Sequence, residues 1–227
     1  MYNALTSANI LTIVNEGLEP GRGTVAAKDA FHKLFHLCDY PSGGWQFLEN
    51  SDFFNAPAST MYHGNWPGGL AEHSLLVLLQ TVKLCTSMGV TLPGRRGEVV
   101  DGVEQPLDEE RLAYLREMVL AALLHDVSKA DYYEQSTRNV KDESGQWRQV
   151  PFFKRREGVP SLPHGVESLS RIERWRPLGA AWRSAVVHHM GAFCQGNLET
   201  FSVSCRAYPE VLLLHTADMW AAQVKGV

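Results

Sequence analysis

The segment LLHDVSKAD, residues 123–131, places a histidine and an aspartate side by side at the end of a long apolar run. The preceding residues, LDEERLAYLREMVLAALL (107–124), open with acidic side chains, which suit a helix N-terminus. They become wholly apolar toward His125, so we expect the second half of this helix to be buried. Neither an imidazole nor a carboxylate belongs in a core unless something pairs it. The pair His125–Asp126 therefore indicates a buried polar site.

Helical periodicity continues on both sides of this segment, and it predicts an all-α fold with one β-hairpin insertion. Further helices are expected within residues 24–40, 68–89, 164–175, 178–191 and 207–226. Leu75, Leu76, Leu79, Val82 and Cys85 should point inward in the second of these, which Gly89 should end. Alternation around the turn signal DESGQ (142–146) predicts a hairpin at about 137–153, which is the only convincing strand pair.

The rest of the chain is expected to be less regular. Residues 1–23 end in the loop EGLEPGRG and should form a loosely docked lead-in to a single domain at 24–227. Residues 39–69 are expected to be an aromatic-rich irregular segment, and residues 90–107 an exposed loop. His32 and His36 flank the apolar stripe of the helix at 24–40 and are interpreted as surface or packing residues.

Composition limits the function. The chain has 227 residues, 44% of them hydrophobic, which suits one globular domain with a full core. Its net charge of −4 disfavours a protein that coats nucleic acid in general. There is no basic and apolar leader and no run of 18 apolar residues, so we expect a cytoplasmic protein without a membrane span. Four scattered cysteines are expected to be free thiols, and they are Cys38, Cys85, Cys194 and Cys205.

Polar residues interrupt several of the expected apolar helices. They are His73, the pair His125–Asp126, His164, the pair His188–His189 and Asp218. One such residue alone would ordinarily be a hydrogen-bonded core residue, but a shared metal would satisfy all of them together. Imidazole and carboxylate without thiolate suit Mn, Fe, Ni, Co or Zn, with Mg as an alternative. The sequence therefore predicts a metal site that the fold assembles from distant segments.

This pattern resembles the HD-domain superfamily of metal-dependent phosphohydrolases. The matching motifs are GGLAEHS (68–74), LLHDVSK (123–129) and LLLHTADMWAA (212–222). The segment FFNAPASTMYHGNWPGGLAEHSLLV (53–77) is similar to the exoribonuclease-like branch, and the likeness runs from about Trp45 to the C-terminus. The resemblance implies an HD-type helical bundle at 24–227 and metal ligands at His73, His125, Asp126 and Asp218.

Branches of that superfamily that hold two metal ions are similar to this chain in two further places. PHGVESL (163–169) offers His164, and HHMG (188–191) offers one of two adjacent histidines. Because HMG aligns best with versions that have a single histidine, His189 is the expected ligand, and His188 is expected to contact substrate or the outside of the site. The resemblance thus implies two divalent ions, with the Asp126 carboxylate bridging them.

Other residues near these motifs have expected roles outside the ligand set. Lys129 follows Asp126 by three residues, and its ammonium could neutralise charge on a transferring phosphoryl group. The alternative is that Lys129 only serves the helix C-terminus. His215, three residues before Asp218, is expected to lie behind the ligands. His63, in MYHGNW, is a candidate substrate contact or outer ligand.

The hairpin region carries the expected substrate contacts. Residues 138–156 hold six basic and two acidic side chains, a local charge of +4, with Trp147, Phe152 and Phe153 among them. One interpretation is a flap at the rim of the site, in which Arg138 and Lys141 contact phosphate and an aromatic side chain contacts a base. The other is a solvated hairpin. A patch this small suits a nucleotide, a cyclic nucleotide or an oligonucleotide end rather than long duplex DNA.

The expected function is hydrolysis of phosphate esters of nucleotides or short oligonucleotides by water that divalent ions activate. Two alternatives stay open. HD-type folds with six His and Asp ligands also include di-iron oxygenases, and a silent site could simply bind a nucleotide. Neither the base, the metal nor the oligomeric state follows from the sequence.

Overall fold

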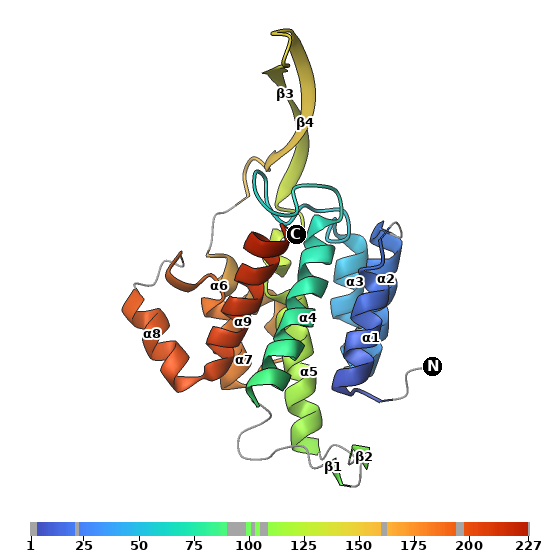
Figure 1. The fold of residues 1–227 in the computed structure, drawn as a ribbon, viewed down its shortest axis with the longest axis vertical. Coiled ribbons are helices and arrows are strands. Elements are labelled where there is room, and N and C mark those ends of the chain that lie inside the picture. Colours follow the sequence, from blue (N-terminus) through green and yellow to red (C-terminus); the bar gives the residue numbers. More distant parts are fainter. Residues whose placement is uncertain are drawn as a thin grey trace.

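The structure is a computed structural model that describes residues 4–20, 23–89, 99–100, 103–104, 109–159, 163–193 and 198–226. Figure 1 shows a body of packed helices from which one β-hairpin projects. The body contains α1 (Ser7–Gly17), α2 (Gly23–Leu37), α3 (Ser42–Asn50), α4 (Gly69–Met88), α5 (Glu109–Leu124), α6 (His164–Glu173), α7 (Ala180–His188), α8 (Leu198–Ala207) and α9 (Pro209–Met219). The predicted all-α fold with a hairpin insertion is confirmed.

Helix α4 lies at the centre of the body and packs against α1, α2, α5 and α9. Leu75, Leu76, Leu79, Val82 and Cys85 are buried in it, as the periodicity predicts, and Gly89 ends it in the left-handed conformation at a φ of 61°. The second half of α5 is buried throughout, from Met118 to Leu124. Two neighbouring helices therefore bring their apolar faces together at the middle of the chain.

The N-terminal residues differ from expectation. Residues 7–17 form α1, which buries Ile10, Ile13 and Val14 against α2 and α4, so the prediction of a loosely docked lead-in is wrong. Thr6 caps this helix, since its side chain accepts a hydrogen bond from the backbone N–H of Asn9 at 3.2 Å. Residues 18–20 of the Gly/Pro stretch follow the end of α1, and Gly23 begins α2.

Three further elements were not expected from the sequence. Residues 42–50 form α3, although the glycines Gly43 and Gly44 disguise it as a loop. Residues 198–207 form α8, in which no side chain is buried, so its pattern gives no core signal. A short antiparallel pair joins β1 (Val99–Val100) to β2 (Val103–Glu104), and the other residues of the expected loop at 90–107 lie outside the described residues.

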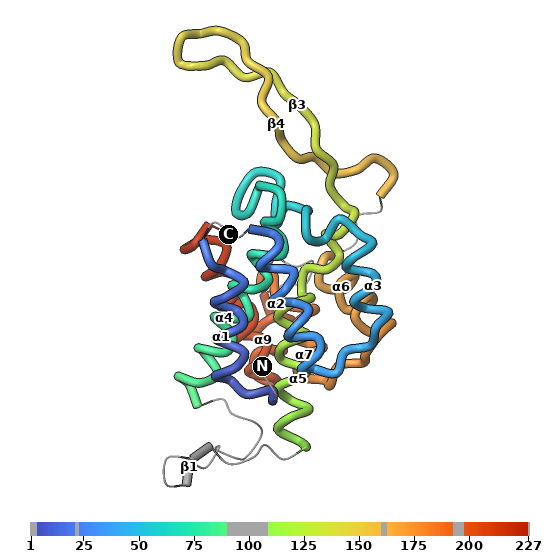
Figure 2. The backbone as a smooth tube through the Cα atoms, turned by 90° about the vertical axis from the view of Figure 1, so that its right-hand side faces the viewer, coloured from blue at the N-terminus to red at the C-terminus, as the bar shows by residue number. Residues whose placement is uncertain are grey.

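The predicted hairpin is present and longer than expected. Strand β3 (Tyr133–Lys141) pairs antiparallel with β4 (Trp147–Arg155), from Tyr133 opposite Arg155 to Lys141 opposite Trp147. The turn between them is built by Asp142, whose side chain accepts hydrogen bonds from Ser144 and Gln146. Figure 2 shows this pair as an arm that stands clear of the helical body.

Cysteines and surface histidines follow the expectation where they are described. Cys38 and Cys85 are buried free thiols, Cys205 is a half-buried free thiol, and Cys194 lies outside the described residues. His32 and His36 are exposed on α2. None of the described helices is both long enough and apolar enough to cross a lipid bilayer.

Candidate metal centre

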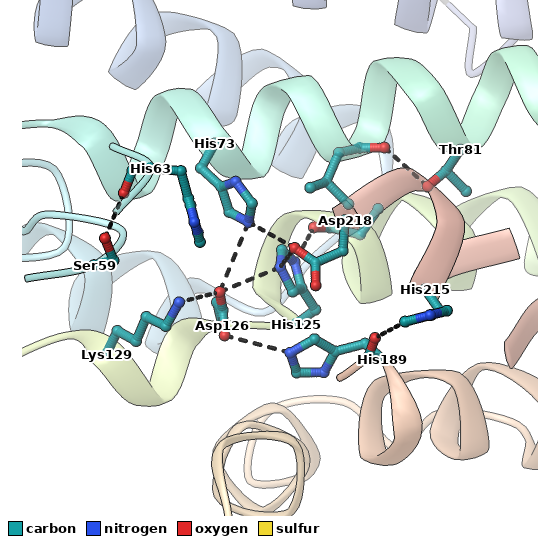
Figure 3. A network of polar contacts seen from close by, with 12 residues as sticks. Ser59, His63, His73, Thr81, His125, Asp126, Lys129, His189, His215 and Asp218 are labelled. Carbon is teal, nitrogen blue, oxygen red and sulfur yellow. Dashed lines mark hydrogen bonds and ion pairs between the residues drawn. The ribbon is translucent and has the colours of Figure 1, made fainter. Parts of the chain in front are cut away.

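Imidazoles and carboxylates from separate helices meet in the middle of the body (Figure 3). The group consists of His73 from α4, His125 and Asp126 after the end of α5, His189 after the end of α7, and Asp218 from α9. Each of these side chains is buried. His73, His125 and Asp126 offer atoms within 4.8 Å of one another, close enough to hold one metal ion.

Short distances join the imidazole nitrogens to the two carboxylates. His73 Nε2 lies 3.1 Å from Asp218 Oδ1 and 3.8 Å from Asp126 Oδ2. His125 Nε2 lies 3.4 Å from Asp126 Oδ2, and His189 Nε2 lies 3.5 Å from Asp126 Oδ1. Asp126 therefore has a histidine nitrogen near each of its oxygens, which places it at the centre of the group.

Backbone hydrogen bonds set the tautomers of two of these histidines. His125 Nδ1 lies 2.8 Å from the carbonyl oxygen of Ala122, and His189 Nδ1 lies 2.7 Å from that of Val186. Because a carbonyl oxygen can only accept, Nδ1 must carry the proton in each ring, and in a neutral ring Nε2 then carries a lone pair. The lone pairs of both Nε2 atoms point into the group, as in histidines that bind metals.

Buried atoms in the group lack hydrogen-bond partners among the described residues. They include His125 Nε2, His189 Nε2 and Asp126 Oδ1. A buried polar atom without a partner costs about 1–3 kcal/mol, more if it is charged. All three atoms are electron-pair donors that face each other, so another protein group of the same kind could not satisfy them. A cation could, and the residues present therefore fit a metal ion.

The net charge of the group also favours a bound cation. Asp126 and Asp218 bring two negative charges, against the one positive charge of Lys129, whose Nζ lies 2.6 Å from Asp126 Oδ2. Burial alone would raise the pKa of Asp126, but Lys129 and His125 hold it well below its usual range. For Asp218, burial is again outweighed, here by the hydrogen bond to His73 and the charge on nearby histidines, so its pKa is lowered. Both acids are therefore ionised, and their two negative charges exceed the one positive charge of Lys129.

A turn of 3₁₀-helix, η1 (Val127–Lys129), brings Lys129 to Asp126. The helical run ends at Leu124, so the expected continuation of α5 is replaced by this tighter turn, in which residues three apart are eclipsed. Ser168 of α6 accepts a hydrogen bond from the Ser128 N–H, and the Arg171 guanidinium donates to the carbonyls of Val127 and Ala130. The contacts from α6 fix the turn, and neither residue stands out in the sequence.

His63 lies beside the group, on the loop that precedes α4 (Figure 3). Its ring centre is 5.0 Å from that of His73, and its Nδ1 is buried without a hydrogen-bond partner among the described residues. Burial, helped by His73 and Lys129, lowers its pKa to about 4, so the ring is neutral at pH 7. Gly69 allows this packing, because a Cβ there would lie 2.1 Å from the Gly64 carbonyl oxygen.

His164, the remaining expected metal ligand, is not one of the five side chains of this group. It begins α6, half-buried, with its ring centre 5.7 Å from that of Tyr132. Burial lowers its pKa, and Asp126, Lys129 and His189 lie near enough to affect it. Its neighbour Gly165 packs closely on the end of α7, since a Cβ there would lie 2.5 Å from the Val186 oxygen. No ion pair between His164 and the group is found in the described residues, so its role as a ligand stays a prediction.

Of the two adjacent histidines at the end of α7, only His189 belongs to the buried group. His189 is fully buried in the group, with its ring centre 4.9 Å from that of His125, whereas His188 is only half-buried and ends α7. His215 Nδ1 lies 2.7 Å from the His189 carbonyl oxygen and so supports the turn that carries His189. The structure thus puts His215 behind the group. The substrate contacts suggested for His188 and His63 stay predictions.

The hairpin projects from the helical body, and the substrate contacts suggested for Arg138 and Lys141 stay predictions. Arg138 lies opposite Val150, Lys141 lies opposite Trp147 at the last pair before the turn, and the arm projects away from the body. Both cations are exposed and rest on aromatic rings of the arm itself, Arg138 on Phe152 and Lys141 on Trp147. The strand alternation located the hairpin, but only its tertiary setting gives its direction.

Tyr133, at the base of the arm, was missed by the sequence reasoning. Burial raises its pKa, Lys129 opposes that shift and Asp126 adds to it, so the phenol is within electrostatic reach of both. The residue directly before it, Tyr132, donates its N–H to the Lys129 carbonyl oxygen at 3.2 Å. The sequence signal that could have indicated Tyr133 is the pair of adjacent tyrosines, Tyr132 and Tyr133, shortly after Lys129.

Comparisons with known protein families, with curated proteins and with solved structures find no match for this chain. The geometry and chemistry of its own residues therefore carry the functional argument.

Proposed function

We propose that this protein is a metal-dependent phosphohydrolase that acts on phosphate esters of nucleotides or short oligonucleotides. The observation that carries the proposal is the buried group of His73, His125, Asp126, His189 and Asp218, in which imidazole lone pairs and carboxylates face each other beside an ammonium. The resemblance of the same residues to the motifs of HD-domain phosphohydrolases supports it.

The ligand types suit hard or borderline divalent ions such as Mn, Fe, Co, Ni or Zn, with Mg as an alternative. Such an ion would supply Lewis-acid activation of a phosphate ester and of water. His73, His125, Asp126 and Asp218 would hold it, and His189 together with His164 extends the set toward a second ion. No serine or cysteine nucleophile is required.

Lys129 gives the site a specific affinity for phosphate. Its pKa is raised, because the effect of burial is outweighed by Asp126 and Tyr133, so the side chain is a cation. An ammonium held in a buried site stabilises negative charge on a phosphoryl group far better than one in water. His63, neutral and with Nδ1 available, can donate or accept a hydrogen bond at the same face. Lys129 and His63 are the residues that favour a phosphate-binding site over a purely structural metal site.

The test is turnover of a defined panel by protein loaded with each divalent ion in turn. The panel comprises 5′-mononucleotides, 2′,3′- and 3′,5′-cyclic nucleotides and dinucleotides, with products separated by chromatography. His125→Ala and Asp126→Asn should abolish turnover and reduce bound metal measured by elemental analysis. His36→Ala, a change to an exposed histidine on α2, is the matched control and should retain both.

Three results would overturn the proposal. They are full turnover by Asp126→Asn, nucleotide that binds to metal-loaded protein and is recovered unchanged, and dioxygen consumption by the iron form without phosphate-ester cleavage. The second result would indicate a binding protein and the third an HD-type oxygenase.

A further inference from the structure

A cavity of about 340 Å³ lies between the base of the hairpin and the loop that follows α3. Figures 1 and 2 both show this loop and the foot of the arm side by side. Its walls include Asn55, Pro57, Tyr133, Gln135, Phe153 and Arg156. The volume is in the range of small-molecule sites, which begins at about 300 Å³. The cavity contains none of the residues of the metal centre.

A set of polar contacts holds the two walls of this cavity together. Asp52 Oδ1 accepts the Asp131 N–H at 2.6 Å, and the Asp131 carboxylate accepts the Asp52 N–H at 3.2 Å. Arg156 donates to Asp52 Oδ2 at 2.9 Å and to the Tyr133 carbonyl oxygen at 2.8 Å. The loop and the base of the arm are therefore tied to each other on both sides of the turn at residues 130–132. The cavity is preformed by these bonds rather than by contacts with a ligand.

Tyr133 connects the cavity to the metal centre. It lines the cavity, and its phenol lies within electrostatic reach of Lys129 and Asp126. Lys129 and Tyr133 are separated only by the turn at Ala130–Tyr132, which Asp131 closes in the left-handed conformation at a φ of 60°. Tyr133 therefore belongs both to the lining of the cavity and to the short segment that directly follows Lys129.

The chemistry of the lining favours a flat, uncharged, hydrogen-bonding group. Phe153 and Tyr133 supply aromatic surface, and Asn55 and Gln135 supply amide donors and acceptors. The guanidinium of Arg156 is already bonded to the carboxylate of Asp52, which also lines the cavity. Such a lining is unfavourable for a phosphate. It suits a nucleobase, which stacks on aromatic rings and hydrogen-bonds along its edges.

We propose that this cavity is the base-binding subsite of the enzyme, and that it takes the nucleoside of a nucleotide whose phosphate lies at Lys129. The inference rests on the proposed function, and it adds the part of the substrate that the metal centre does not recognise. Specificity for nucleotides over other phosphate esters then comes from the foot of the hairpin, not from its basic outer half.

The first test is binding of nucleosides without turnover. Adenosine, guanosine, cytidine and uridine are titrated by calorimetry into the full chain in the presence of a chelator, with ribose as the ligand without a base. At least one nucleoside should bind and ribose should not. Phe153→Ala should weaken that binding at least about tenfold, in line with the 1–3 kcal/mol of a base–aromatic stack. Gln149→Ala, in the outer half of the same strand, should bind as the wild type does.

The second test uses turnover. Phe153→Ala should lower kcat/KM for a mononucleotide about tenfold or more and leave kcat/KM for ribose 5-phosphate unchanged. Phe153→Leu, which keeps apolar volume without the ring, serves if the alanine variant does not fold, and it should show the same selectivity loss. Nucleosides that do not bind, or an equal loss in Phe153 and Gln149 variants, would overturn the subsite. Nucleoside binding without any hydrolysis would overturn the proposed function and leave the subsite standing.

Discussion

Two ion pairs of almost equal length occupy opposite environments in this molecule. Lys129 Nζ lies 2.6 Å from Asp126, and Arg148 Nε lies 2.5 Å from Asp142. The Lys129 and Asp126 side chains are 9% and 2% exposed, whereas those of Arg148 and Asp142 are 71% and 20% exposed. Water screens the second pair and is excluded from the first. Contact distance alone therefore says little about what a charge does here, and burial decides it.

The largest expected effect is loss of the proposed activity when the centre of the buried group is changed. Asp126→Asn keeps the shape of the side chain but removes one of the two carboxylate charges. We expect turnover to fall to the background rate and the metal content to drop, because Asp126 faces both His125 and His189. Steady-state kinetics and elemental analysis check this. Asp142→Asn is the counterpart on the arm, and a similar loss in that variant would remove the distinction between the two regions.

Next in size is the effect of removing the cation from each pair. Lys129→Gln leaves the Asp126 carboxylate buried without its ammonium, and we expect it to lower the free energy of unfolding of the metal-free protein by about 3–5 kcal/mol. Arg148→Gln removes an exposed partner and should leave the free energy of unfolding unchanged. Urea unfolding of both variants measures the difference. Equal values would show that burial does not control the strength of these pairs.

Metal should then reverse part of that loss. A ligand that binds only the folded state at 100 times its Kd stabilises it by about 2.7 kcal/mol. We expect Mn²⁺ or Zn²⁺ to stabilise the wild type by this order and to stabilise Lys129→Gln at least as much, because a metal cation compensates the same carboxylates. Thermal melts at increasing metal concentration check this. Metal that stabilises Asp218→Asn and His73→Ala as well as the wild type would contradict the assigned site.

A smaller effect is expected where backbone packing positions the group. Gly165→Ala would place a methyl group 2.5 Å from the Val186 and Val187 carbonyl oxygens, so α6 must move away from the end of α7. We expect a loss of about 1–3 kcal/mol from overpacking and a weaker affinity for metal, since His189 directly follows α7. Gly145→Ala is the control for a glycine with open space around it, although its φ of 80° adds local strain. Unchanged metal affinity in Gly165→Ala would show that the packing of α6 on α7 does not position the metal ligands.

The smallest effects are expected at the exposed cations of the arm. Arg138→Ala and Lys141→Ala should leave stability unchanged, because both side chains are exposed. KM should stay the same for mononucleotides and rise a few-fold for oligonucleotides long enough to reach the outer half of the arm. Kinetics at two salt concentrations measure this, since contacts to phosphate weaken as salt rises. A raised KM for mononucleotides would favour the flap interpretation over the solvated hairpin.

Much of the helical framework was predictable, because apolar side chains repeat at helical intervals in α4 and fill the second half of α5. Helix α3 was not, since two glycines near its start hide its pattern, and α8 was not, since it buries no side chain. Helix α1 was placed outside the domain because loop residues follow it. In each case the missing information is tertiary packing, which sequence spacing does not contain.

The candidate site, too, was predictable in part. Polar residues inside apolar helices pointed to His73, His125, Asp126, His189 and Asp218, and the structure brings these together. The path of the chain after Lys129 could not be predicted from the sequence. It depends on contacts of Asp52 with Asp131 and Arg156, which are both far from Asp52 in the sequence. The direction of the hairpin and the place of Tyr133 both follow from that junction.

The hairpin also lies, along the chain, between the two halves of the buried group. His73, His125 and Asp126 come before its turn, and His189 and Asp218 come after it. A protease that cuts at the exposed turn 142–146 would produce two fragments, each with only part of the ligand set. Neither fragment would carry the whole group, but α4 packs against α9 and α5 against α7, so contacts between the two fragments would bring its parts together. We therefore expect metal binding to depend on the meeting of the two fragments, so that bound metal would report their reassembly.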